Sequence, residues 1–121
     1  MRAKFRWENC ELLGYSTAYL IEVSKKDDRN EVLKNLSLED KRRAQSNEYI
    51  SHVKSWSKNN PDLANSESIY VLFSEDGKKG QLVDPEFPYS GQWNAYCPLF
   101  AVDFEFFSLS DIVNASTQGS I

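Results

Sequence analysis

The sequence predicts an α+β fold, in which a mainly antiparallel sheet of about five strands carries one amphipathic helix on one face. Three observations predict it. Two runs near the N-terminus alternate apolar and polar residues, as half-buried strands do. A helical pattern follows over 37–58 and ends at a proline. Apolar and aromatic runs then return between 68 and 107. The expected order is ββαβββα, with a short C-terminal helix.

The first two strands are expected to pair as a hairpin. Residues 3–8 alternate apolar with charged side chains, and residues 15–23 alternate again with β-branched and aromatic ones. Leu13-Gly14 suits the turn between them. Residues 24–30 are polar and charged, which indicates a loop, and 31–36 is expected to form a short helical turn.

The main helix is expected to begin after the N-cap residue Ser37. Asp40 lies three residues later and forms an acidic variant of the capping box. The helix should run to about Lys58, because Asn59-Asn60-Pro61 disfavours helical angles. At 100° per residue, the side chains that share one apolar stripe are Leu38, Gln45, Tyr49, Val53 and Trp56.

The C-terminal half is expected to supply the remaining strands. In order, the predicted elements are a strand over 68–73, a turn over 75–80, a returning strand over 81–84, a long ordered loop over 85–98, a strand over 99–107, a helix over 108–115 and a frayed tail over 116–121. The 121 residues fit one domain with one core, so residues 1–121 are read as a single domain.

Composition and the cysteines bear on the cellular compartment. The apolar and aromatic content is too high for intrinsic disorder. The N-terminal residues are charged, and no apolar run reaches the length of a signal peptide or a membrane span. We therefore expect a cytoplasmic protein in which Cys10 and Cys97 are buried free thiols. A disulfide is the alternative, if the protein is exported by a route that leaves no signal in the sequence.

The formal net charge of -4 conceals a segregation of charge along the chain. Residues 25–58 hold nine bases and six acids, whereas residues 75–121 hold two bases and seven acids. The acidic half also contains a cluster of aromatic residues. Aromatic anchors beside carboxylates suit a surface that binds a basic protein. The predicted partner-binding residues are Asp84, Glu86, Tyr89, Trp93, Asp103 and Glu105.

The same residues also have a purely structural interpretation. Asp103 and Glu105 alternate with apolar residues, as acids on any half-solvated strand do. The aromatic residues of 85–98 could equally fold back and close one end of the core. Asp103 and Glu105 also fall on one strand face at a spacing usable for glycoside chemistry, but two alternating acids are too common to indicate it.

Other catalytic patterns are weak. Cys97 with the single histidine, His52, lacks the sequence context of a nucleophile and base, and His52 lies at the edge of an apolar helix face. Asp62, Asp76 and Lys78 resemble a magnesium-nuclease pattern, but Lys78 falls in an expected hairpin turn rather than on a rigid strand. We predict no catalytic residue, no metal site and no cofactor.

The basic side of the main helix, with Arg43, Lys54 and Lys58, is too thin for nucleic-acid binding, and the rest of the chain is acidic.

The leading hypothesis is a protein-binding inhibitor, most simply a bacterial immunity or antitoxin-like protein that occludes the active site of a basic toxin or nuclease. A phage- or plasmid-encoded anti-defence inhibitor is one alternative. A small-ligand-binding or enzymatic domain with a pocket between helix and sheet is another, and a structural homo-oligomer subunit is a third.

Overall fold

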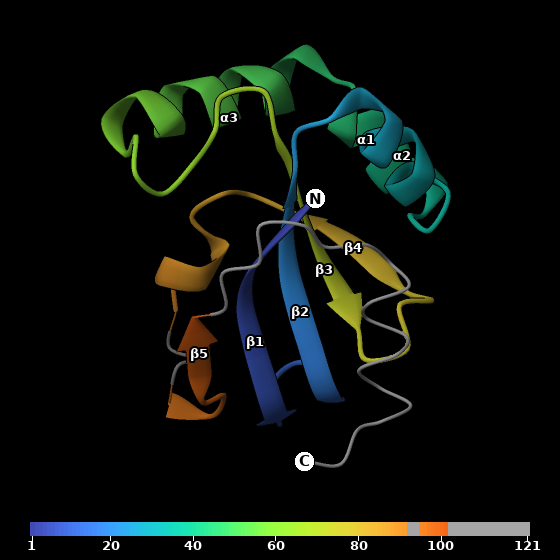
Figure 1. Ribbon diagram of the computed structural model, residues 1–121, viewed down its shortest axis with the longest axis vertical. Helices are drawn as coiled ribbons and strands as arrows, with labels where there is room; N and C mark the ends of the chain where they lie inside the picture. The colour runs from blue at the N-terminus through green and yellow to red at the C-terminus, as the bar shows by residue number, and fades with distance from the viewer. Residues whose placement is uncertain (92–94, 102–121) are drawn as a thin grey trace.

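The computed structural model describes residues 1–91 and 95–101 and has an α+β architecture (Figure 1). The strands form one antiparallel sheet, and three helices connect the second strand to the third. The strands are β1 (Arg2–Cys10), β2 (Tyr15–Val23), β3 (Ile69–Ser74) and β4 (Gly80–Val83). A short fifth strand, β5 (Leu99–Ala101), pairs with β1, so the order across the sheet is β4-β3-β2-β1-β5.

The α+β class and the antiparallel sheet are confirmed, but the predicted order ββαβββα is wrong. The order from β1 to β4 is ββαααββ, because three helices occupy the interval in which the sequence predicted one helix and a short helical turn. The helices are α1 (Lys26–Leu33), α2 (Leu38–Ala44) and α3 (Asn47–Asn59). The end of the predicted strand 99–107, the helix over 108–115 and the tail over 116–121 lie outside the described residues.

Both predicted hairpins are confirmed. β1 pairs with β2 with Trp7 opposite Ala18, and the Gly14 N–H donates to the Cys10 carbonyl at 3.0 Å in the turn. Gly14 has a φ of 68°, which glycine adopts without strain. β3 pairs with β4, and Gly77 has a φ of 71° in the connecting turn. The turn residues recognised in the sequence therefore predict both reversals of the chain correctly.

The long helix predicted over 37–58 is broken at Ser46. The Ser46 hydroxyl accepts a hydrogen bond from the Tyr49 N–H at 3.2 Å, so Ser46 is the N-cap of a new helix. Ser37 caps α2 as predicted, with its hydroxyl accepting from the Asp40 N–H at 3.1 Å. Because the helix axis changes at the break, Leu38 does not share the apolar stripe of α3 and is 63% exposed.

The first helix, α1, lies where a loop and a single helical turn were expected. Its sequence is strongly charged, and Val32 is its one buried residue. That composition lacks the apolar periodicity from which amphipathic helices are recognised. Asp27 and Asp28 stand in its first turn, where negative charge is favoured by the helix dipole.

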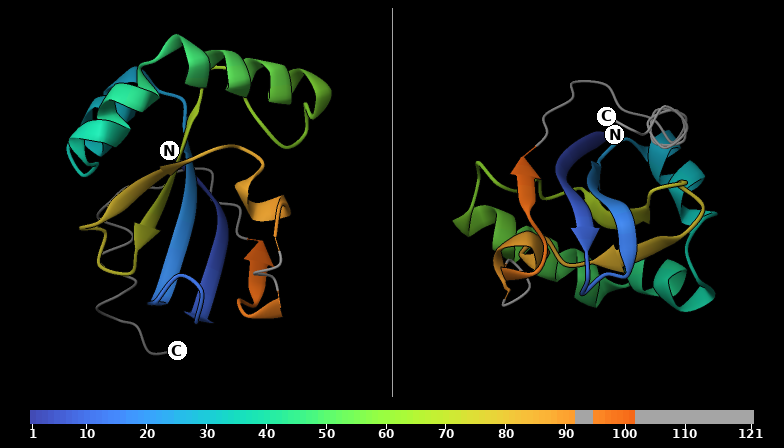
Figure 2. Two further views of the ribbon diagram at one scale, coloured as in Figure 1. Left: turned by 180° about the vertical axis from the view of Figure 1, so that it is seen from behind. Right: turned by 90° about the horizontal axis from the view of Figure 1, so that it is seen from below.

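The helices gather at the end of the sheet where β2 ends and β3 begins, and Figure 2 shows the same arrangement from behind. α2 and the residues before it also cover the outer edge of β4. The Gly80 N–H donates to the Asn35 carbonyl at 3.3 Å, and the Leu82 N–H donates to the Asp40 carboxylate at 3.2 Å. These bonds satisfy edge donors that would otherwise be open to another strand.

The central strands are buried on both faces. Every residue of β3 is buried, as are the last six residues of β2. The half-buried alternation expected of the second strand is therefore wrong for these six residues. β1 keeps the predicted alternation, with Trp7 fully buried in the core.

The two cysteines do not remain free thiols. Cys10, at the end of β1, forms a disulfide with Cys97, and their Cα atoms lie 4.3 Å apart. Both residues are buried. The pairing of β1 with β5 brings them together, a contact that spacing in the sequence could not indicate. The disulfide is the alternative that the sequence left open, and such bonds persist mainly in oxidising compartments.

Candidate functional site

The structure places half of the predicted partner-binding residues in one short segment. Asp84 directly follows β4, Glu86 lies two residues later, and Tyr89 ends the 3₁₀ helix η1 (Phe87–Tyr89). Trp93, Asp103 and Glu105 lie outside the described residues, so their relation to this segment is open.

Asp84 is tied to the last turn of α2. Its carboxylate accepts a hydrogen bond from the Arg43 guanidinium at 2.6 Å, and both side chains remain partly exposed. The Arg43 guanidinium also lies 5.4 Å from the centre of the Tyr49 ring, within range of a cation–π interaction. The acid predicted to attract a partner's cation therefore already holds one from this chain.

Glu86 is held by the single histidine. Nε2 of His52 lies 2.8 Å and 2.9 Å from the two carboxylate oxygens of Glu86, so both oxygens face one ring nitrogen. His52 projects from α3, and both side chains are partly exposed. The histidine thus fastens the segment after β4 to α3.

Tyr89 adds an aromatic contact one helical turn further along α3. Its ring stacks on Trp56 with centroids 5.9 Å apart, and it meets Phe5 edge-on at 5.6 Å. Tyr89 nevertheless stays 43% exposed. Partial burial raises the pKa of its hydroxyl above the ordinary value. We call Asp84, Glu86 and Tyr89, with their partners Arg43, His52 and Trp56, the acidic–aromatic surface.

The 85–98 loop was interpreted either as an exposed aromatic surface or as a segment that closes the core, and the structure shows features of each. Pro88 is fully buried, and Phe87 packs edge-on against Trp7 at 6.2 Å. Tyr96, in contrast, is one of the large exposed side chains of the described chain. The loop therefore closes part of the core while presenting Tyr89 and Tyr96 to solvent.

His52, Asp84 and Glu86 are the one group of three or more metal-ligating side chains in the described part of the chain. Their donor atoms lie within 4.8 Å of one another. An imidazole with two carboxylates is a ligand set that zinc or manganese accepts. Each acid, however, already has a partner within hydrogen-bond distance, Arg43 for Asp84 and His52 for Glu86. These contacts explain the geometry without a metal.

The weak catalytic patterns gain no support from the geometry. Cys97 is bonded to Cys10 and has no thiol to act as a nucleophile. Asp76 lies in the β3–β4 turn, where its carboxylate accepts from the Ser74 hydroxyl at 2.7 Å and from the Lys78 N–H at 2.9 Å. The Ser74 hydrogen bond is the main reason that the pKa of Asp76 is lowered. Asp76 and Lys78 are thus explained as turn residues.

A buried polar cluster was missed at the sequence level. Glu22 is only 9% exposed, although its place in β2 indicated a solvated side chain. Its carboxylate accepts from the Tyr70 hydroxyl at 2.7 Å and lies 3.6 Å from the Lys4 ammonium, which also donates to the Leu63 carbonyl. The Asn65 N–H completes the set at 3.2 Å. This cluster joins β1, β2 and β3 to the loop before β3.

A pocket, which we call the helical pocket, lies between the three helices and the start of β3. The sequence hypothesis of a ligand-binding domain placed a pocket between helix and sheet, lined by Tyr and Trp. The observed lining includes Tyr49 but no tryptophan, and its charged residues are mostly basic. The signal available in the sequence was the excess of bases in 25–58, which the separate helices bring together.

Among the described residues, no helix is long and apolar enough to span a membrane. Comparison with protein-family models, with curated proteins and with solved structures gives no significant match to this chain. The function is therefore argued from the geometry of its own residues.

Proposed function

We propose that the protein is a small protein-binding inhibitor, of the immunity or antitoxin type, that covers the active site of a basic enzyme such as a toxin or nuclease. The observation that carries the proposal is Tyr89. Its ring is fixed between Trp56 and Phe5 yet stays 43% exposed, beside Glu86. Tyrosine side chains held rigid before binding are effective interface anchors, because little conformational entropy is lost in the complex.

In this proposal the acids of the surface contribute less to the binding energy than Tyr89 does. Asp84 is paired with Arg43, and Glu86 lies within hydrogen-bond distance of His52, so a partner's arginine or lysine would have to compete with these contacts. We therefore assign most of the binding energy to Tyr89, and assign to the acids the attraction that speeds association. Seven acids against two bases in residues 75–121 supply the long-range field.

The test begins with capture of partners from lysates of the source cells, using the wild-type chain and a Tyr89→Ala, Glu86→Gln variant in parallel. A captured basic enzyme is then purified, and its activity and its affinity for each chain are measured. We expect activity to be lost at stoichiometric addition of the wild-type chain. The double variant should bind about thirtyfold more weakly.

The matched control is Glu11→Gln, which removes an exposed acid in the β1–β2 turn. It should leave the affinity unchanged. A partner that binds the double variant and the wild type equally would overturn the assignment of this surface. A separate Asp103→Asn, Glu105→Gln variant tests the two acids that were predicted from the sequence alone.

A further inference from the structure

The helical pocket has the size and lining of a small-molecule site. Its volume is about 560 Å³, within the range of ligand pockets. Side chains from all three helices line it, and Leu33, Ile50, Ile69 and the ring of Tyr49 supply apolar surface. An apolar ligand body of moderate size would therefore find contacts on several sides.

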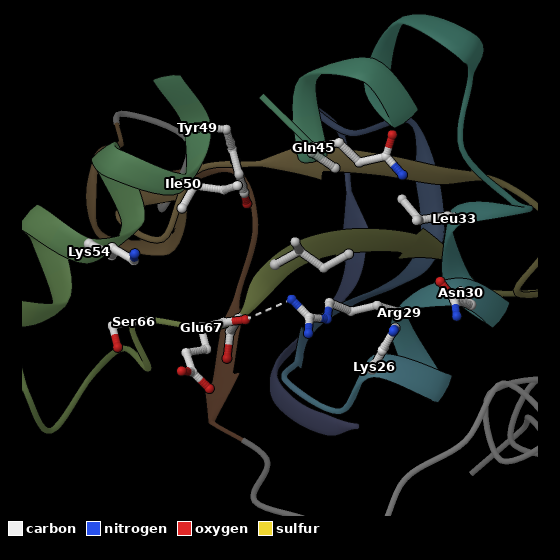
Figure 3. Close-up of a pocket in the computed structure, with 13 residues that line it drawn as sticks. Lys26, Arg29, Asn30, Leu33, Gln45, Tyr49, Ile50, Lys54, Ser66 and Glu67 are labelled. Atoms are coloured by element: carbon white, nitrogen blue, oxygen red, sulfur yellow. Dashed lines mark hydrogen bonds between the residues drawn. The ribbon is translucent and has the colours of Figure 1, made fainter. Parts of the chain in front are cut away.

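The charged residues around this pocket are unbalanced. Lys26 and Arg29 come from α1 and Lys54 from α3, whereas Glu67 is the single acid in the lining. Figure 3 shows Arg29 and Lys54 reaching in from opposite sides. Arg29 donates to the backbone carbonyl of Glu67 at 3.3 Å, and no described residue forms a salt bridge with Lys26 or Lys54. The pocket thus concentrates positive charge in a chain whose net charge is -4.

An unsatisfied hydroxyl in the same wall is the second observation. Ser68 lines the pocket and is 4% exposed, and its Oγ has no hydrogen-bond partner among the described residues. The hydroxyl is covered in the unliganded chain, and a buried hydroxyl without a partner costs free energy. A ligand group that reaches it through a small shift of the wall would therefore be stabilised.

We propose that the helical pocket binds an organic anion: a carboxylate, sulfonate or phosphate attached to an apolar, largely flat body. The anionic group pairs with Arg29 and the two lysines, the body packs on Ile50 and Leu33, and Ser68 bonds a polar atom of the ligand. A polyanion such as a nucleic acid fits less well, because the surrounding acidic surface repels a long chain of phosphates.

The experiment compares two fluorescent probes with the same aromatic body. One is 8-anilinonaphthalene-1-sulfonate, which carries an anionic group, and the other is the neutral N-phenyl-1-naphthylamine. Both are titrated into the folded 121-residue chain. We expect a single saturable site with at least tenfold preference for the sulfonate, and we expect that preference to fall as salt is raised.

Variants locate the site. Arg29→Gln and Lys54→Gln should each weaken sulfonate binding about tenfold while leaving the neutral probe nearly unchanged. Lys58→Gln, one turn further along α3 and outside the lining, is the matched control. Ser68→Ala should weaken binding without lowering thermal stability, because it removes a hydroxyl that no described residue satisfies.

Equal affinities for the two probes in the wild-type chain would overturn the proposal, since binding would then reflect exposed apolar surface alone. A sulfonate preference that survives the Arg29→Gln, Lys54→Gln double variant would also overturn it. Both outcomes are independent of the inhibitor proposal, because none of these substitutions alters the acidic–aromatic surface.

Discussion

The hydroxyl of Tyr49 accepts a hydrogen bond from the backbone N–H of Tyr70, 3.1 Å away, and so joins α3 to the second residue of β3. The same hydroxyl donates to the Val83 carbonyl at 2.8 Å, which ties α3 to the end of β4 as well. The Tyr70 hydroxyl continues the chain of bonds by donating to Glu22. Two buried tyrosines therefore link α3 to β3 and β4, and β3 to β2.

Substitution Tyr49→Phe should lower the free energy of unfolding by about 2 kcal/mol, because it leaves the Tyr70 N–H and the Val83 carbonyl buried without their partner. Urea denaturation followed by circular dichroism measures the change. Tyr15→Phe is the control, since Tyr15 is only half-buried at the start of β2, and its effect should stay within about 0.5 kcal/mol. A loss for Tyr49→Phe no larger than that of the control would contradict the bridging role.

The protein should lose stability at alkaline pH. Burial raises the pKa of both Tyr49 and Tyr70 above the ordinary value near 10, and the hydrogen bond to Glu22 adds to the effect at Tyr70. In the unfolded chain the same hydroxyls ionise near pH 10. Their stabilisation is therefore complete below pH 10 and declines above it, by up to about 1.4 kcal/mol per pH unit for each tyrosine.

Urea unfolding at pH 8, 10 and 11, with tyrosinate absorbance recorded in parallel, measures that decline. In Tyr49→Phe the free energy of unfolding should decline less steeply above pH 10, because one of the two buried tyrosines no longer ionises. An unchanged slope would show that Tyr49 ionises alike in the folded and unfolded chains.

The Cys10–Cys97 disulfide should stabilise the fold by about 2–4 kcal/mol, because it closes a long loop in the unfolded chain. Comparison of the oxidised protein with the Cys10→Ser, Cys97→Ser variant by urea denaturation measures this difference. Alkylation under denaturing conditions provides the chemical check. The air-oxidised chain should take up no iodoacetamide before reduction and two equivalents after it, and two equivalents before reduction would refute the bond.

The cap at Ser46 should contribute about 1 kcal/mol to stability, since its hydroxyl satisfies the Tyr49 N–H at the start of α3. Ser46→Ala tests this contribution by thermal unfolding. Ser55→Ala, at an exposed position inside α3, is matched in chemistry and should be neutral or slightly stabilising, because alanine has the higher helix propensity. Equal effects of the two substitutions would show that the helix break does not depend on the cap.

Local chemistry in the sequence predicted several elements correctly. Alternation predicted β1 and β2, the glycines at 14 and 77 marked the turns of both hairpins, and Ser37 was identified as a helix cap. The Ser46 cap was missed because the apolar stripe continues through it, although serine followed by asparagine competes well for a helix start. α1 was missed because its charged composition carries no periodic signal.

For the candidate site, the sequence predicted a segment of the chain but not the contacts that this segment makes. The coincidence of acids and rings predicts Asp84, Glu86 and Tyr89 as one surface, and all three lie in the short segment after β4. That Arg43 and His52 come from the helices to meet the two acids depends on contacts about 34 to 41 residues apart in the chain. No local pattern reports a pairing over that distance.

The sequence by itself determined the α+β class, the two hairpins and the segregation of charge, because each depends on neighbouring residues or on composition. The tertiary structure alone decided which groups meet: the two cysteines, the Lys4–Glu22 pair, and the bases gathered around the helical pocket. The physical reason is that these contacts form only when packing of the core fixes the directions of the helices and strands.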